Sequence, residues 1–315
     1  MSADPALGTA LARLESRWGS AAVRVGLGID RSGVPSRSNA AGRADAPAVP
    51  LVDGALALAP AEAHPELGEP QPAGALLPDE IVSTGFARLD ALLGTGGLPR
   101  GVSASFRGPR SSGKTTLALH CLAQAQARGG IVAFLDPCRI FDPLEAAARG
   151  VDLRWLLILR PADVDEGWAL AAALVAGRLI DLLVVDLPER LRAGGHDASL
   201  RRLAAHARRS SVRMIVLEPT SVAAPVHGAL AESVAMRLEL EQRAWLRAGR
   251  DIVGRCVAVN VAKNRFGPPG RQTEIEIRYL ADGEHAAALD RFATSDREIM
   301  RLPATEPTRL IARPA

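Results

Sequence analysis

The sequence predicts an α/β fold with a mostly parallel, twisted sheet and an antiparallel extension at one edge. Apolar segments of strand length alternate with amphipathic segments of helical length between residues 101 and 218, which is typical of a parallel sheet covered by helices. Three β-like segments then follow without helices between them, and they predict the antiparallel edge. A glycine-rich loop separates the first strand of this series from its first helix, as in sheets that bind phosphate groups.

The alternating elements are expected in a regular order along the chain. The predicted strands are short apolar runs, whereas the predicted helices repeat apolar residues every three or four positions. Strands are expected at residues 101–108, 131–136, 156–161, 179–186 and 212–218, and helices at 114–128, 142–150, 165–178 and 198–210. The antiparallel strands are expected at 233–246, 252–264 and 272–280.

Composition divides the chain into an ordered core and less regular flanking regions. Residues 6–17 place leucines at helical spacing, and residues 21–28 read as a short strand. The next region is rich in Pro, Gly, Ser and Ala without periodicity, which predicts a disordered linker. The predicted regions are an N-terminal helix and strand (1–29), the linker (30–77), the core (78–283) and a short tail (284–315) with one helix at 286–293.

Charge and cysteine content restrict the class of protein. The formal net charge is +3 and the pI is about 9.1, so a nucleic-acid partner is permitted but not required. The three cysteines are far apart and form no CxxC pair, which favours a reducing, cytoplasmic location over a disulfide framework or a zinc site. No apolar run reaches the roughly 18 residues of a membrane span, and we expect no membrane partner.

The stretch GPRSSGKTT carries the strongest chemical signal. Gly108, Gly113, Lys114 and Thr115 satisfy the G-x-x-x-x-G-K-[ST] pattern between a predicted strand and a predicted helix. Glycines let the backbone wrap phosphates, the lysine supplies a compact charge, and the threonine hydroxyl can ligate Mg²⁺. The pattern therefore predicts ATP and Mg²⁺ as cofactors. The expected phosphate-binding residues are Gly108, Ser111, Ser112, Gly113, Lys114, Thr115 and Thr116.

A carboxylate is expected beside this loop. Asp186 follows the apolar run LLVV and ends a predicted central strand. The carboxyl ends of parallel strands share one edge of a sheet, so Asp186 would lie near Thr115 and hold the water shell of Mg²⁺.

Lysine occurs at two positions only, Lys114 and Lys263, and every other basic residue except histidine is arginine. A base-composition bias of the genome explains the scarcity of lysine, and the two exceptions then become informative. Lys263 is either an ordinary solvated lysine or a functional one.

Several segments together resemble the RecA recombinase family. They are STGFARLDALLGTGGLPRG before the glycine-rich loop, AFLDPCRIFDPLEAAARGVDL and DLLVVD after it, LARLESRWGSAAVRVG near the N-terminus, and VAKNRFGPP near residue 263. The resemblance covers about residues 6–25 and 80–283. It implies a RecA-like ATP-binding core, with an N-terminal helix that joins subunits into an oligomer or filament through residues 6–25.

The resemblance also implies roles for individual residues. Lys263 and Arg265 match a K-N-[KR] segment that reaches ATP held by the adjacent subunit, and Asp142 matches a residue that accepts a hydrogen bond from the adenine amino group. At other positions this chain departs from the family. Cys138 stands where the family carries the glutamate that polarises the attacking water, so we expect slow hydrolysis or none. Asp136 or Glu218 could substitute for that glutamate.

Two further departures concern the nucleotide. Glu145 replaces the aromatic residue that stacks on adenine, and Glu218 or Pro219 replaces the amide that senses the γ-phosphate. We therefore expect weaker nucleotide binding. The two loops that grip DNA in recombinases are shortened here.

A predicted helix still offers a basic face to DNA. Its arginines either contact phosphates or form a solvated basic face, and no aromatic residue lies nearby to stack on bases. The candidate DNA contacts are Arg201, Arg202, Arg208 and Arg209. His196, His206 and His227 have no metal-ligand spacing and are expected at the surface.

Three functions from different classes are compatible with these residues. Residues 156–174 and 200–210 resemble ImuA proteins, RecA-like accessory factors that act with the polymerase-like protein ImuB and an error-prone C-family polymerase. The leading hypothesis is an ATP-binding accessory protein of the SOS response to DNA damage, which modulates RecA filaments or recruits a polymerase for translesion synthesis. The alternatives are a compact DNA-dependent ATPase of the RecA family and a nucleotide-independent regulator, such as a cell-division inhibitor.

Overall fold

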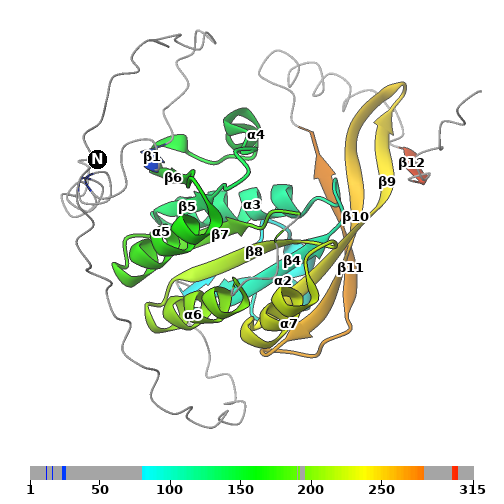
Figure 1. The fold of residues 1–315 in the computed structure, drawn as a ribbon. Helices are drawn as coiled ribbons and strands as arrows, with labels where there is room; N and C mark the ends of the chain where they lie inside the picture. The colour runs from blue at the N-terminus through cyan, green and yellow to red at the C-terminus, as the bar shows by residue number, and fades with distance from the viewer. Residues whose placement is uncertain are drawn as a thin grey trace, which may run out of the picture.

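A twisted ten-stranded sheet forms the centre of the molecule, with helices on both faces (Figure 1). The computed structural model describes residues 80–189, 191, 196–279, 23–25 and 300–303, together with Ala12 and Ser16, which are both helical. The expected linker and the expected helix at 286–293 lie outside the described residues.

The parallel part of the sheet follows the predicted order of strands and helices. The strands are β4 (Ser103–Gly108), β5 (Val132–Leu135), β6 (Leu156–Leu159), β7 (Leu182–Asp186) and β8 (Arg213–Pro219). The helices between them are α3 (Lys114–Ala127), α4 (Pro143–Ala148), the short 3-10 helix η2 (Leu153–Trp155), α5 (Val164–Ala176) and α6 (His196–Arg209). The α/β fold with a mostly parallel sheet is thus confirmed.

The antiparallel strands extend one edge, as the sequence predicts. The strand order is β1-β6-β5-β7-β8-β4-β9-β10-β11, with β4 parallel to both β8 and β9. The added strands are β9 (Met236–Ala248), β10 (Asp251–Asn264) and β11 (Gln272–Arg278), and β12 (Met300–Pro303) pairs with the far half of β9. At the opposite edge, β1 (Val23–Val25) pairs antiparallel with β6 of its own chain.

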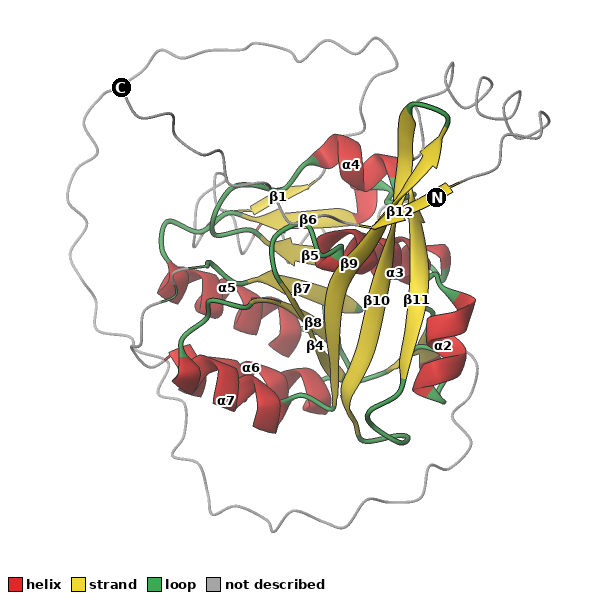
Figure 2. Cartoon of the chain, turned by 90° about the vertical axis from the view of Figure 1, so that its right-hand side faces the viewer, coloured by secondary structure: helices red, strands yellow, loops and turns green. Residues whose placement is uncertain are grey.

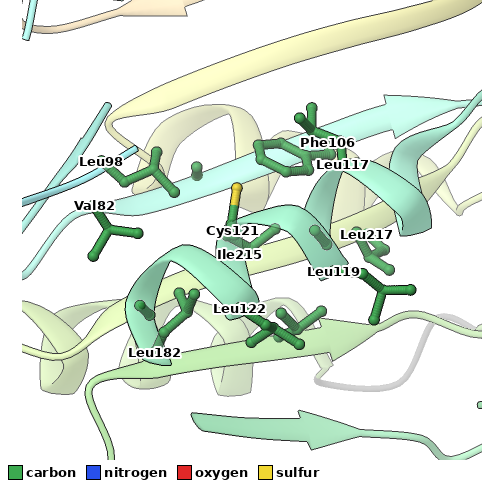
Figure 3. Packing of buried hydrophobic residues seen from close by; sticks show 14 of the residues in the cluster. Val82, Leu98, Phe106, Leu117, Leu119, Cys121, Leu122, Leu182, Ile215 and Leu217 are labelled. Carbon is green, nitrogen blue, oxygen red and sulfur yellow. The ribbon is translucent and has the colours of Figure 1, made fainter. Parts of the chain in front are cut away.

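Each face of the sheet has its own hydrophobic core. Helices α5, α6 and α7 (Ala224–Ser233) cover one face, whereas α3 and α2 (Ala87–Leu93) cover the other (Figure 2). Helix α3 packs with Leu117, Cys121 and Leu122 against Phe106 of β4 and the neighbouring strands (Figure 3). Because α3 is anchored along its length, its N-terminus and the loop before it are held rigidly at the sheet edge.

The structure contains some helices and strands that the sequence does not predict. They are short, or they lie where a loop is expected. Helix α2 is fixed at its start by Asp90, whose carboxylate accepts hydrogen bonds from Ser83 Oγ at 2.5 Å and from Thr84 N at 2.9 Å. The small hairpin-like pair β2 (Ile81–Val82) and β3 (Leu98–Pro99) precedes β4. Among the described residues, no helix is long and apolar enough to span a membrane.

Candidate nucleotide-binding site

The phosphate loop, residues 109–113, joins the central strand β4 to helix α3 at the carboxyl edge of the sheet. Ser111 has a φ of 60° and Gly113, the N-cap of α3, has a φ of 92°, so two left-handed residues turn the chain into the helix. The first N–H groups of a helix have no partner within the helix and point out of its N-terminus. The loop thus ends in a set of donors suited to an anion.

The two glycines of the G-x-x-x-x-G-K-[ST] pattern are required by close packing beneath the loop. A Cβ on Gly108 would lie 2.6 Å from the carbonyl oxygen of Leu240, and one on Gly113 would lie 2.9 Å from Cδ1 of Ile277. Both distances are too short for a non-bonded contact of a Cβ atom with oxygen or carbon, and Gly113 also has the left-handed backbone that favours glycine. The loop therefore keeps its curvature only with glycine at these positions.

Lys114 and Thr115 lie where the loop enters the helix. The Lys114 ammonium donates to the carbonyl oxygens of Gly108 at 3.3 Å and Pro109 at 3.2 Å. Burial lowers the pKa of Lys114, and the carboxylates of Asp186 and Glu189 oppose this effect. Thr115 is exposed in the first helical turn, whereas Thr116 is buried in the core. A glycine cradle, an ammonium group and an exposed hydroxyl fit a nucleoside polyphosphate with Mg²⁺.

The two serines of the loop have different surroundings. The hydroxyl of Ser112 is buried, and its oxygen has no hydrogen-bond partner among the described residues. Any phosphate contact at Ser112 therefore has to come from its main chain. The carbonyl of Ser111 accepts a hydrogen bond of 2.6 Å from Nη1 of Arg255, which anchors the loop to β10.

Asp186 ends β7 at the same sheet edge as the loop. It pairs in register with Leu217 of β8, which in turn pairs with Phe106 of β4, so one strand separates the carboxylate from the loop. Within the described residues its carboxylate accepts no hydrogen bond. Desolvation raises the pKa of Asp186 to about 6, with Lys114 opposing and Asp136 adding to the shift. A poorly solvated carboxylate at the same sheet edge as an exposed threonine hydroxyl is a suitable partner for a hydrated magnesium ion.

Cys138 lies in the loop after β5, close to these charges. Its side chain is exposed, and the pKa of its thiol is raised by desolvation and then by the carboxylates of Asp186, Asp136 and Glu189. The thiolate is therefore disfavoured at neutral pH. A neutral thiol is a poor general base, which agrees with the expectation that hydrolysis is impaired.

Asp136 is not free to replace the missing base. Its side chain is fully buried, and it accepts hydrogen bonds from the main-chain N–H groups of Ile140 at 2.9 Å and Phe141 at 3.1 Å. Arg160 pairs with it at 3.4 Å. The carboxylate holds the loop that carries Cys138, so its role in this structure is structural.

Glu218 is engaged even more completely. Its carboxylate is fully buried and accepts a hydrogen bond of 2.8 Å from Ser105 Oγ. Nδ1 of His227 lies 2.6 Å from Oε1, Nη2 of Arg237 lies 3.1 Å from it and Nε of Arg107 lies 3.3 Å from it. These partners come from β4, α7 and β9, and together they argue against Glu218 as a base or a phosphate sensor.

The expected adenine side is built around α4. Asp142 is the N-cap of this helix, and its Oδ1 accepts hydrogen bonds from the N–H groups of Leu144 at 2.9 Å and Glu145 at 3.3 Å. Glu145 pairs with the buried Arg149 at 2.9 Å, whose guanidinium lies 5.9 Å from the centre of the Tyr279 ring. Contact between Asp142 and adenine stays a prediction.

Lys263 and Arg265 are engaged with α7 and not with the phosphate loop of their own chain. The Lys263 ammonium donates to the carbonyls of Ala231 at 2.6 Å and Glu232 at 3.2 Å, and Arg265 donates to Glu232 at 3.1 Å. Cations stabilise a helix C-terminus in this way. A contact with nucleotide on another subunit stays a prediction.

The arginines of α6 are exposed along one side of the helix. Arg201 pairs with Glu232 at 2.9 Å and Arg202 donates to Ser199 at 3.2 Å, so these two are partly neutralised or engaged. Arg208 lines a cavity of about 220 Å³ together with Arg100 and Arg265. Arg209 is exposed, and contact of these residues with DNA stays a prediction.

The expectation that the three histidines lie at the surface is wrong for His196. The His196 side chain is only 14% exposed and its Nδ1 accepts a hydrogen bond of 3.2 Å from Trp168 Nε1. His227 is 37% exposed and contacts Glu218. The two contacts join residues 28 and 9 positions apart, and spacing alone gives no sign of them.

Three arginine contacts around the loop were not predicted from the sequence. Arg255 reaches Ser111 across 144 positions, Arg107 donates to the carbonyl of Thr220 at 3.3 Å, and Arg110 pairs with Glu189. The position of Arg110 inside the glycine-rich pattern was a usable signal, because that position carries a charged side chain next to the expected phosphates.

Comparison with known proteins agrees with this geometry. A family model described as the RecA N-terminal domain matches residues 73–193. Protein RecA of Blastochloris viridis is 36% identical over 233 residues, covering 65% of this chain and 67% of the relative. Protein RecA of Symbiobacterium thermophilum is 34% identical over 227 residues, covering 64% and 65%.

A third relative matches this chain over a similar length and at a similar identity. Protein RecA of Leifsonia xyli subsp. xyli is 35% identical over 239 residues, covering 67% of each protein. The chain thus spans about two thirds of the length of these relatives. With its glycine-rich loop between β4 and α3, its strand order and this similarity, the chain belongs to the RecA family.

Proposed function

We propose that this chain is an ATP-binding accessory protein in DNA repair that hydrolyses ATP slowly or not at all. One observation carries the proposal. The phosphate loop keeps Lys114 and Thr115 at the sheet edge where Asp186 lies, whereas the resemblance to RecA implies that Cys138 replaces the catalytic glutamate, and the carboxylates of Asp136 and Glu218 are both engaged. Binding and hydrolysis are therefore separated in this site.

Each residue has a defined task when Mg-ATP is bound. The N–H groups at the start of α3 and the Lys114 ammonium hold the phosphate oxygens, and Thr115 with Asp186 holds Mg²⁺ and its water shell. Bound Mg²⁺ supplies charge neutralisation between the phosphates. No residue in this proposal removes a proton from water, because the Cys138 thiol stays protonated at neutral pH.

ATP that is bound but not consumed can stabilise an assembly. A ligand shifts a population toward the state that it contacts better, and this requires no turnover. We propose that the N-terminal helix and strand join copies of the chain, with Lys263 and Arg265 approaching nucleotide on the neighbouring copy. The assembly would then act in damage-tolerant DNA synthesis, in contact with RecA or with ImuB-like and C-family polymerase partners, as the resemblance to ImuA suggests.

The proposal is tested by measuring binding and turnover on the same preparation. Binding of a labelled ATP analogue with little ATP hydrolysis, both with and without single-stranded DNA, is the expected result. Hydrolysis that DNA stimulates strongly would refute the proposal and would favour a compact DNA-dependent ATPase. A chain that binds no nucleotide would favour the nucleotide-independent regulator.

A further inference from the structure

Arg110 is a charged residue within the phosphate loop that the proposed function has not used. It directly follows Gly108 and Pro109, whose carbonyls hold the Lys114 ammonium. Its side chain is 81% exposed and forms two contacts with Glu189, one from Nη2 to Oε2 at 2.9 Å and one from Nε to Oε1. The guanidinium thus presents its planar fork to a carboxylate at the mouth of the loop.

Glu189 belongs to the segment that follows Asp186, and this segment is held at two points. The N–H of Leu187 donates to the carbonyl of Leu217 at 3.2 Å, and the carbonyl of Glu189 accepts a hydrogen bond of 3.0 Å from Ser221 Oγ. The negative charge of Glu189 opposes the lowering of the pKa of Lys114 by burial, and it adds to desolvation in raising the pKa of the Cys138 thiol. The carboxylate therefore lies close to the place where the loop and the lysine hold phosphate.

The ion pair between Arg110 and Glu189 can be broken, and replaced by another contact of Arg110, at a low cost in free energy. Exposed ion pairs contribute little net stability, because solvent screens them and two side chains lose freedom. A guanidinium binds phosphate oxygens in the same two-point geometry that it uses for a carboxylate. A phosphate group at the mouth of the loop therefore competes directly with Glu189 for Arg110.

The end of the neighbouring strand offers no competing donor for such a group. Glu218 is buried among its own partners, and Pro219 has no donor on its side chain or main chain. Arg107 is directed toward Glu218 and the carbonyl of Thr220. Among these strand-end residues and the loop, Arg110 has the exposed cationic fork.

We propose that Arg110 recognises the terminal phosphate of a bound nucleoside triphosphate by exchanging Glu189 for that phosphate. Arg110 is then the residue that distinguishes triphosphate from diphosphate, and Glu189 sets the threshold for the exchange. This inference rests on the proposed ATP binding and adds the residue that reads the state of the nucleotide.

The test measures binding of two ligands to the full chain by titration calorimetry, a non-hydrolysable ATP analogue and ADP, each with Mg²⁺. We expect Arg110→Ala to weaken binding of the triphosphate about 10-fold or more, the effect of one charge-assisted contact, and to change ADP binding about twofold or less. Arg110→Lys should recover part of the loss. Glu189→Gln removes the competitor and should tighten binding of the triphosphate alone.

Arg154→Ala is the matched control, because Arg154 is 73% exposed and forms a comparable pair with Asp152 away from the loop. It should leave both affinities unchanged. Equal weakening of triphosphate and diphosphate by Arg110→Ala would overturn the inference, as would a Glu189→Gln chain that binds the triphosphate no more tightly. A wild-type chain that binds neither nucleotide would instead refute the proposed function, which is a distinguishable failure.

Discussion

Asp186 and Glu218 lie at the carboxyl ends of the neighbouring parallel strands β7 and β8, yet their surroundings differ in opposite ways. Glu218 is fully buried and is surrounded by Ser105, Arg107, His227 and Arg237. Asp186 accepts no hydrogen bond among the described residues, and burial raises its pKa to about 6. The comparison teaches that a neutralised carboxylate holds the strands together, whereas an unsatisfied one is available for an added cation.

The same division separates the two ends of the candidate site. The end that holds phosphate and metal keeps exposed or weakly satisfied groups, such as Thr115 and Asp186. The end expected to activate water contains a protonated thiol and the structural carboxylate of Asp136. Under the proposed function, the protein thus retains what binding needs and lacks what hydrolysis needs.

The largest effect is expected from breaking the network of Glu218. Glu218→Ala leaves the buried Arg237 without its carboxylate, which should reduce the free energy of unfolding by about 3–5 kcal/mol. Chemical denaturation measures this value. Glu241→Ala removes an exposed partner of Arg243 and should change stability by about 0.5 kcal/mol or less. Similar stabilities for both variants would contradict the structural role of Glu218.

The next largest effect is expected for Lys114, whose positive charge opposes the rise in the pKa of Asp186. Lys114→Ala should weaken binding of Mg-ATP about 100-fold, or about 2.7 kcal/mol, because the phosphates lose a charged contact. Titration calorimetry with the wild-type chain and Arg243→Ala as a surface control measures the change. Unaltered affinity in Lys114→Ala would place the nucleotide somewhere other than this loop.

The contrast between Asp186 and Glu218 can be tested by measuring how the free energy of unfolding depends on pH. Its pKa is about 6 in the folded chain against 3.8 unfolded, so the folded state binds the proton more tightly. Stability should therefore fall by about 2–3 kcal/mol as the pH rises from about 4 to 6, in buffer without Mg²⁺. Asp186→Asn should remove this slope. A slope that persists in the variant would assign it to another group.

The smallest effect is expected at the adenine side. Asp142 caps α4 with two accepted hydrogen bonds, and Asp142→Ala should reduce stability by about 1 kcal/mol. Asp142→Asn keeps the cap and should be nearly neutral for folding. If Asp142 also contacts adenine, Asp142→Ala should reduce the preference for ATP over GTP, which competition binding can measure.

Much of the fold follows from the sequence because local patterns and topology agree. The loop pattern between a strand and a helix predicts the edge at which Asp186 and Lys114 meet, and the structure confirms that placement. Helix α7 was missed because Pro225 and Gly228 interrupt its helical pattern, although proline is well accepted in the first turn of a helix. Tertiary packing decides whether such short segments become helical.

The polar contacts of the site could not be predicted in the same way. Ser105 and Glu218 are 113 positions apart, and Arg110 and Glu189 are 79 positions apart. The strand order brings each pair together, and neither spacing nor residue type indicates which arginine reaches which carboxylate. For the same reason Glu218 was a plausible base in the sequence and is a structural residue in the fold.

The most direct test of the account is the rate of ATP hydrolysis by the wild-type chain and by Cys138→Glu, with binding of an ATP analogue measured on both. We expect similar binding, little turnover in the wild type and a rate at least about 100-fold higher in Cys138→Glu, the usual contribution of a positioned general base. Equal and low rates in both, with binding intact, would contradict the claim that the missing carboxylate separates binding from hydrolysis. High turnover in the wild type would contradict it as well.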